Sequence, residues 1–164
     1  MTTLLILLVM VLLLLAQGFF SGSEIALVNA DKLKLRHLAS KGHKGAKRVL
    51  KMFEQPEVLL GTTLVGTNVS LVALTTLGTL LMIQLFGRYG DLIAFLFYTP
   101  LFLIFGEVVP KSVYQQKADQ LAPRIIFPLH LFSLLFYPVV WIFSHLARLI
   151  VRLVGVKPSH HSPF

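Results

Sequence analysis

Three stretches of the chain contain no charged residue, and their length limits the possible folds more than any other feature. They cover residues 1–23, 58–87 and 125–147. A helix needs about 20 predominantly apolar residues to cross a bilayer. Only 13% of the residues are charged, whereas about a quarter are charged in a typical soluble domain. The sequence therefore excludes the soluble globular class and predicts an all-α integral membrane protein.

The distribution of basic residues predicts the topology. Eight of the 15 Lys and Arg residues lie between positions 32 and 51, in the segment that joins the first two apolar stretches. Cytoplasmic loops of membrane proteins carry an excess of Lys and Arg, so we expect this segment to face the cytoplasm and the N-terminus to lie outside. The same segment accounts for much of the net charge of +8, and no nucleic-acid partner is expected.

The leucine-rich N-terminal run is interpreted as a retained helix. No basic residue precedes it, whereas a cleaved secretory signal has a positively charged start and a shorter apolar core. Belt helices at the membrane surface, with their lysines toward lipid phosphate, are expected between and after the spans. Residues 1–155 are thus predicted to form one membrane domain. Its expected elements are three transmembrane helices at about 3–28, 58–86 and 92–110, and juxtamembrane helices at about 31–54 and 123–154.

The last apolar stretch is long enough to cross the membrane, but its charges and prolines favour another placement. A single crossing would put Arg148 and Arg152 outside, against the expected distribution of positive charge. Pro128 and Pro138 divide the stretch, and proline in a helix interior costs about 3 kcal/mol. We therefore expect short helices packed around three spans and a cytoplasmic C-terminus, with four spans as the alternative. Residues 156–164 are interpreted as a linker or tail.

Two carboxylates within the apolar segments are the main candidates for chemistry. Glu24 lies beside two serines in FFSGSEIAL, and Glu107 follows fifteen uncharged residues. Ionisable residues at membrane depth are costly and are functional candidates by default. Pro110 has no N–H, so the carbonyl of Gly106 is expected to be free beside Glu107. Carboxylate, hydroxyl, amide and carbonyl oxygens suit Mg²⁺ or Ca²⁺.

Structural roles for the same residues remain open. Glu107 could pair with Lys111 one helical turn later, and Glu24 could pair with a basic residue at the inner membrane surface. Small and hydroxylated residues of membrane helices also mediate close packing, which is what we expect of most threonines in the second span.

Three motifs occur in a specific order along the chain. They are FFSGSEIALVNADKLKLRHLASKGHKGAKRVL, LLGTTLVGTNVSL and GEVVPKS. Together they resemble the transmembrane domain of the CNNM/CorC family of magnesium transporters, over about residues 10–155. The resemblance implies three transmembrane helices per subunit, a juxtamembrane belt and an inward-facing acidic cavity for Mg²⁺. It also implies Mg²⁺ export across the plasma membrane, with Na⁺ as the proposed coupling ion.

The resemblance further implies a homodimer, a set of ion-site residues and a missing module. Small residues of the second span would let helices of two copies approach closely; they are Gly61, Gly66, Ala73 and Gly78. The positions that match the family's ion site are Ser21, Ser23, Glu24, Gly66, Asn68, Ser70 and Glu107, with Lys111 following. Members usually continue into a cytoplasmic CBS module that binds nucleotide, and we expect this module in the full-length protein.

Two other functions compete with transport. A membrane anchor or scaffold for a cytoplasmic regulatory module would use the polar residues only for packing. An intramembrane serine hydrolase would need a histidine beside Ser21 or Ser23, and the candidates are His130 and His145 in the last apolar stretch. The chain contains no cysteine, which excludes thiol catalysis. We expect no enzymatic activity.

Overall fold

The computed structural model describes residues 2–153, which are almost entirely helical and contain no strand. This confirms the predicted all-α fold. The predicted tail, 156–164, lies outside the described residues. In chain order the elements are α1 (Thr2–Asn29), α2 (Lys32–Ser40), α3 (Lys44–Phe53), α4 (Pro56–Phe86), the 3-10 turn η1 (Gly87–Tyr89), α5 (Gly90–Leu103), the π-helical turn η2 (Ile104–Val108), α6 (Val109–Gln116) and α7 (Ala118–Leu153).

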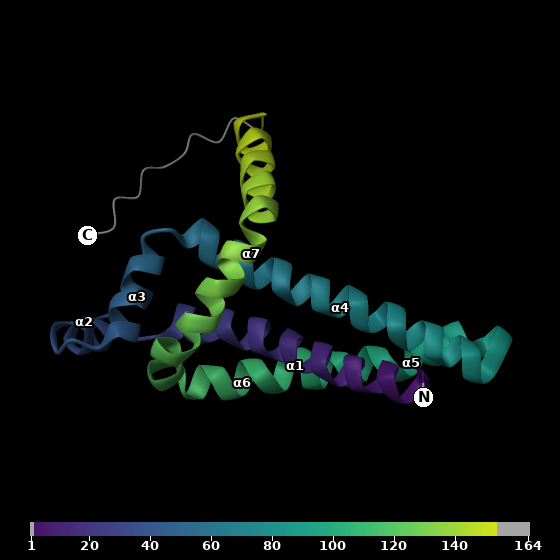
Figure 1. The fold of residues 1–164 in the computed structure, drawn as a ribbon. Coiled ribbons are helices and arrows are strands. Elements are labelled where there is room, and N and C mark those ends of the chain that lie inside the picture. Colours follow the sequence, from purple (N-terminus) through teal and green to yellow (C-terminus); the bar gives the residue numbers. More distant parts are fainter. Residues whose placement is uncertain (1, 154–164) are drawn as a thin grey trace.

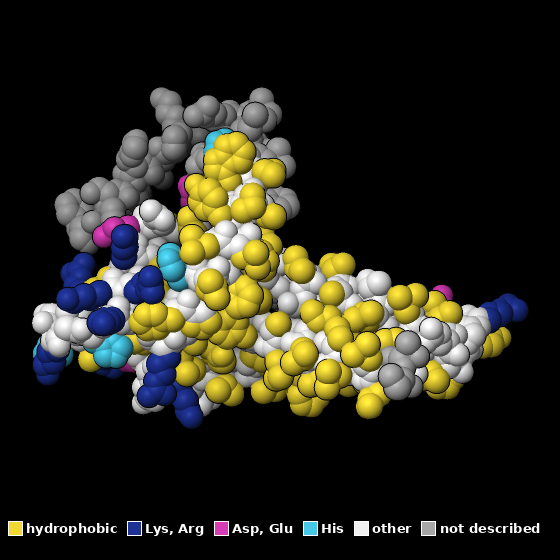
Figure 2. Space-filling view, in the orientation of Figure 1, with side chains coloured by type: hydrophobic (Ala, Val, Ile, Leu, Met, Phe, Trp, Pro, Cys, Tyr) yellow, Lys and Arg dark blue, Asp and Glu magenta, His cyan; other side chains and the backbone are white. Residues whose placement is uncertain are grey.

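Three helical passes lie side by side and form the body of the molecule (Figure 1). They are α1, α4, and the continuous third pass of α5, η2 and α6. By length and apolarity, α1 and the hairpin formed by α4 and the third pass can cross a membrane. Apolar side chains cover most of the face of this bundle that Figure 2 shows. The three segments predicted as spans therefore form the three passes of this bundle.

Helix α7 does not join this bundle as a fourth parallel pass. It contacts α1, α3 and α4, crosses them and then turns away from the bundle (Figure 1). The sequence predicts short helices here, whereas the structure has one bent helix with Pro123, Pro128 and Pro138 inside it. Prolines bend helices, but a bend leaves fewer backbone groups unpaired than a complete break, which matters where water is scarce. By length and composition alone, Ala118–Ile142 could also span a membrane.

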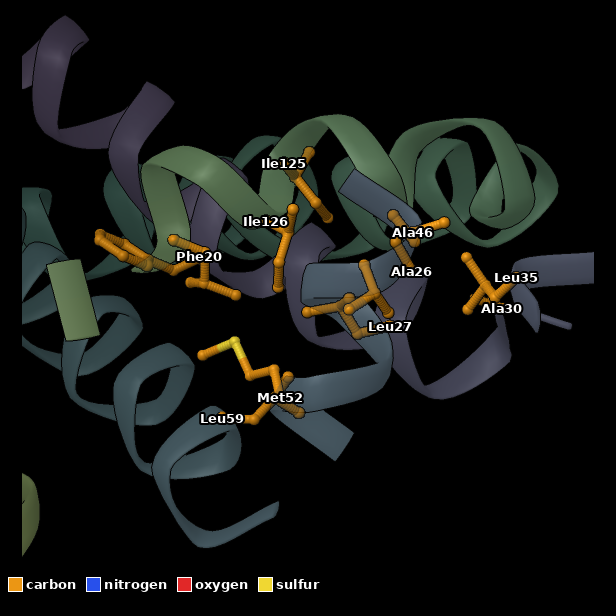
Figure 3. Close-up of a cluster of buried hydrophobic side chains, with 13 residues drawn as sticks. Phe20, Ala26, Leu27, Ala30, Leu35, Ala46, Met52, Leu59, Ile125 and Ile126 are labelled. Atoms are coloured by element: carbon orange, nitrogen blue, oxygen red, sulfur yellow. The ribbon is translucent and has the colours of Figure 1, made fainter. Parts of the chain in front are cut away.

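A hydrophobic core at the charged end of the bundle holds α2 and α3 against the spans. Leu27, Leu35 and Ile126 come from α1, α2 and α7, and Figure 3 shows them among the side chains of this cluster. All three are fully buried, as are Val49 of α3 and Leu129 of α7. Burying one large apolar side chain stabilises a fold by roughly 1.5–3 kcal/mol. The belt helices are therefore fixed to the spans by packing.

Asp119, in the first turn of α7, adds a polar connection to the belt. Its Oδ1 accepts a hydrogen bond from the N–H of Asp31 at 2.8 Å, and its Oδ2 accepts one from Nζ of Lys34 at 2.6 Å. The hydrogen bond and the negative charge of Asp119 raise the pKa of Lys34 above its ordinary value. Because this ion pair is exposed to solvent, it orients the two segments more than it stabilises them.

Two glycines of α4 allow close contacts within one chain. A Cβ atom at Gly66 would collide with the ring of Phe20 on α1, and one at Gly78 would lie 2.7 Å from the ring of Tyr98 on α5. These glycines therefore serve packing between the spans of a single copy. Gly61 and Ala73, the other two small residues expected at a dimer contact, line a groove between α4 and α7.

Candidate functional site

A polar face of α1 is buried inside the bundle. Gln17, Ser21 and Glu24 have the i, i+4, i+7 spacing that aligns side chains along one face of a helix. Gln17 and Ser21 have exposed fractions of 0% and 1%, and Glu24 is half-buried. The sequence around Gln17 folds as a regular helix because it is apolar and uninterrupted. An amide and a hydroxyl are therefore buried on one face of α1.

Several buried polar atoms of α1 and α4 have no hydrogen-bond partner in the part of the chain that the structure describes. They are Nε2 and Oε1 of Gln17 and the hydroxyl oxygens of Ser21, Ser23 and Thr67. Most buried polar atoms in proteins are paired, and leaving one unpaired costs about 1–3 kcal/mol. All but Nε2 are oxygens, so they can act as ligands for a cation.

The backbone hydrogen-bond pattern of the third pass changes from α-helical to π-helical where this pass meets α1. Helix α5 continues into the π turn η2 before α6 begins. Turns of this kind inside α-helices are rare and are frequent at functional sites. Pro110, in the first turn of α6, lacks the N–H that a regular helix would direct to the carbonyl of Gly106. The π turn thus includes Gly106, whose carbonyl the sequence predicts to be free.

Two glycines bring η2 and α6 against α1. A Cβ atom at Gly106 would lie 2.6 Å from Cδ and Oε1 of Gln17, and one at Gly18 would lie 2.9 Å from Cγ of Pro110. Only residues without a side chain fit at such distances. The Gln17 amide therefore lies directly against the backbone beside Glu107. We call Gln17 and Ser21 of α1, with Gly106 and Glu107 of η2, the α1–η2 site.

The carboxylate of Glu107 is only loosely paired. Its side chain is 30% exposed, and its Oε2 lies 3.9 Å from Nζ of Lys111, which is too long for a hydrogen bond. Among the residues described, no basic group forms an ion pair with Glu24. Nor do three or more acidic or histidine side chains gather at any point of this region. The α1–η2 site therefore combines one carboxylate with neutral oxygens.

Comparison with known proteins places the chain in a family. The sequence pattern described as "Cyclin M transmembrane N-terminal domain" (CNNM) matches residues 8–164. The chain belongs to the CNNM transmembrane family. This confirms the resemblance drawn from the three motifs.

Curated relatives share this domain. The UPF0053 inner membrane protein YfjD of Escherichia coli is 33% identical over 85% of the chain, and a UPF0053 protein of Haemophilus influenzae is 34% identical over 91%. A protein named polyamine export protein, from Salmonella typhimurium, is 31% identical over 88%. The matched regions make up 33%, 36% and 35% of these relatives, so the chain spans about a third of their length.

This CNNM domain separates the motif residues of α4. Gly66 and Ser70 are buried on the stripe of α4 that packs against the other spans. Asn68 is exposed on another face, where its Nδ2 donates a hydrogen bond to the carbonyl of Leu64 at 2.8 Å. Asn68 also lines the groove between α4 and α7. Its amide oxygen therefore lies apart from the α1–η2 site in this conformation.

The motif residues of α1 are also divided between two faces. Ser21 is buried and lies one turn after Gln17 on the same face of α1. Ser23 follows two positions later, about 200° around the helix, and is fully buried on a different side. Thus the structure places Ser21 on the α1 face that meets η2 through Gln17, while Ser23 and Asn68 lie on other faces of their helices.

Two polar residues with unpartnered oxygens are missed by sequence reasoning about the site. Gln17 ends a run of thirteen apolar residues, and an amide at that depth is itself a signal. It carries no charge and lies before the recognisable motif, so a search for carboxylates passes over it. Thr67 lies between Gly66 and Asn68, but threonine in membrane helices usually bonds its own backbone. Its burial without a partner is visible only in three dimensions.

The geometry gives no support to a serine hydrolase. The hydroxyls of Ser21 and Ser23 have no hydrogen-bond partner in the described part of the chain, a histidine base included. His130 lines a hollow between α3, α4 and α7. The Nδ1 atom of His145 lies 3.0 Å from the carbonyl oxygen of Trp141 on the same helix.

Proposed function

We propose that this CNNM domain transports Mg²⁺ across the membrane through the α1–η2 site. The observation that carries the proposal is that the side-chain oxygens of Gln17 and Ser21 are buried without a hydrogen-bond partner among the described residues, on the face of α1 that meets the π turn with Glu107. Oxygen donors, including a carboxylate, are the ligands that Mg²⁺ prefers. Irregular backbone inside a membrane bundle is typical of ion sites in transporters.

The residues of the site contribute to ion binding in two ways, as a source of negative charge and as coordinating oxygens. The Glu107 carboxylate supplies negative charge, and in a low-dielectric bundle its attraction for a divalent cation is much stronger than in water. The neutral oxygens replace part of the hydration shell, which Mg²⁺ gives up reluctantly. One carboxylate balances only half of the ion's charge. Glu24, two turns along the α1 face from Gln17 and half-buried, is the second candidate for this role.

The further parts of the proposal concern direction, location and assembly. We infer Mg²⁺ export across the plasma membrane with Na⁺ as the coupling ion, the basic belt in the cytoplasm, and a homodimer that carries a cytoplasmic CBS module. The name of the Escherichia coli relative, an inner membrane protein, supports this location. Mass measurement in mild detergent tests the assembly: twice the mass of the chain is expected, and a monomer would contradict it.

Polyamine export is a second candidate because one relative carries that name. A polyamine has several positive charges along a flexible chain, and its recognition calls for several separated carboxylates. The α1–η2 site has a single carboxylate, that of Glu107, which is 30% exposed, and its neutral side-chain oxygens are buried. This arrangement favours a compact cation. The scaffold alternative makes a different prediction, because a domain that only packs has no reason to be stabilised by one particular ion.

Transport into vesicles tests the proposal. The chain is reconstituted into liposomes that contain a Mg²⁺-sensitive dye, and Mg²⁺ flux is measured with and without a Na⁺ gradient. We expect Mg²⁺ flux that the Na⁺ gradient accelerates and that spermidine does not inhibit. A Mg²⁺ flux that does not change with the Na⁺ gradient would contradict the coupling. Transport of spermidine without transport of Mg²⁺ would favour the polyamine alternative. Absence of flux, together with thermal stability that Mg²⁺ does not change, would favour the scaffold.

A further inference from the structure

A basic hollow lies at the junction of the belt with the spans, away from the α1–η2 site. It has a volume of about 240 Å³ and lies between the end of α3, the start of α4 and the middle of α7. Its polar lining residues are Arg48, Lys51, Gln55, His130, Ser133 and Tyr137. Among the described residues no acidic side chain lines it, although Glu54 and Glu57 lie nearby in the sequence. The hollow therefore combines two positive charges with several hydrogen-bonding groups.

The cationic side chains of this hollow are suited to a phosphate. The guanidinium of Arg48 lies 5.4 Å from the centre of the Phe127 ring, a cation–π contact that holds it against α7. Within the described residues neither Arg48 nor Lys51 forms an ion pair. Arginine binds phosphate oxygens through paired N–H groups, and lysine adds a compact charge.

An apolar groove begins one helical turn further along the same two helices. It has a volume of about 670 Å³ and is lined mainly by valine, leucine, glycine and alanine of α4 and α7. Gly61 of the groove follows Val58 of the hollow by three residues, and Val140 follows Tyr137 by three. On α4, this step leads away from the charged end of the molecule and into the apolar part of the bundle (Figure 2).

The basic hollow and the apolar groove follow one another as the charged headgroup and the acyl chain of an amphiphile do in a bilayer. Tyr137 and Trp141 are exposed on α7 beside them, and such aromatic residues concentrate at headgroup depth. Basic pockets between membrane helices bind anionic lipid headgroups. We propose that the hollow binds the phosphate headgroup of an anionic phospholipid, through Arg48 and Lys51, and that the groove receives one of its acyl chains.

The chain carries its own reporter for this site. Trp141 is its single tryptophan, and it directly follows Val140 of the groove. In vesicles of phosphatidylcholine with phosphatidylglycerol, brominated acyl chains on one lipid or the other quench Trp141 when that lipid is adjacent. We expect phosphatidylglycerol to be preferred by up to about 30-fold at low salt, from two cations near an anionic headgroup.

Variants separate a specific site from the general attraction of a basic surface. R48Q/K51Q should reduce the preference to about onefold, whereas K44Q/K47Q removes the same charge from exposed positions of α3 outside the hollow and should retain it. R48K/K51R keeps both charges and should also retain it, with circular dichroism to show that each variant folds. An equal loss of the phosphatidylglycerol preference in R48Q/K51Q and in K44Q/K47Q would overturn the proposal.

Two further outcomes would assign the surfaces to other occupants. If inorganic phosphate abolishes the preference, the hollow binds a free anion and the lipid proposal is wrong. If neither brominated lipid quenches Trp141 in a chain shown to be dimeric, a second copy covers the groove, and the proposal is again wrong. Salt should weaken the preference steadily, because the attraction is electrostatic.

Discussion

Gln17 places a complete amide inside the bundle without a partner among the described residues. Leucine has a similar size and no polar atoms, so Gln17→Leu removes the uncompensated groups while preserving the packing against Gly106. We expect the ion-free protein to be as stable as the unmodified chain or more stable, by about 1–3 kcal/mol. Because a ligand oxygen is lost, Mg²⁺ binding should weaken in the same variant.

Thermal melting with and without Mg²⁺ measures both effects. A matched control is Thr76→Ala, at an exposed position of α4 whose hydroxyl bonds only its own helix. Loss of ion-free stability in Gln17→Leu, with normal stabilisation by Mg²⁺, would show that the amide is a structural residue. That result would remove Gln17 from the site.

The sequence alone identifies the charged members of the site better than the neutral ones. Glu107 stands out because a carboxylate within an apolar run is costly, and Pro110 indicates the irregular backbone nearby. The orientation of Asn68 cannot be read from a motif, since three successive residues of a helix point to three different sides. Only the packing of α4 against its neighbours determines which side is buried.

At the level of helices, close approach of α1 and α4 depends on Gly66. In Gly66→Ala the added methyl group collides with the Phe20 ring, which itself packs on Phe132 and Phe136 of α7. Overpacking of this kind costs about 1–3 kcal/mol, so we expect a lower melting temperature. Thr76→Ala again provides the control, because exposed substitutions usually change stability by less than about 0.5 kcal/mol. Equal melting temperatures would contradict the close packing of α1 and α4.

The sequence predicts the helices well in the apolar spans, where hydropathy identifies them. It predicts them less well in α7, where prolines interrupt the sequence. The spans follow from length and apolarity, because an isolated helix in lipid must satisfy its own backbone. Helix α7 is predicted as short pieces from its prolines, yet it is one bent helix. Its contacts with α1, α3 and α4 supply packing that offsets the effect of the three prolines, and local sequence does not reveal such contacts.

For the whole molecule, charge predicts which end faces the cytoplasm. The basic belt lies at one end of the bundle (Figure 2), and the turn η1 that joins α4 to α5 lies at the other (Figure 1). The chain has no cysteine, so single cysteines can report the topology. In sealed cells, an impermeant thiol reagent should label Tyr89→Cys from outside and leave Lys41→Cys and Arg152→Cys unlabelled. Labelling of position 152 from outside would instead support four spans.

The central claim is that the α1–η2 site binds Mg²⁺ through Glu107, and calorimetry tests it most directly. Glu107→Gln keeps the size of the side chain and one oxygen but removes the negative charge, so we expect Mg²⁺ affinity to fall by at least about tenfold. Thr75→Ala should bind normally, since that hydroxyl is exposed and bonds its own helix. Equal Mg²⁺ affinity in Glu107→Gln and the unmodified chain would contradict the account and leave Glu107 as a partner of Lys111.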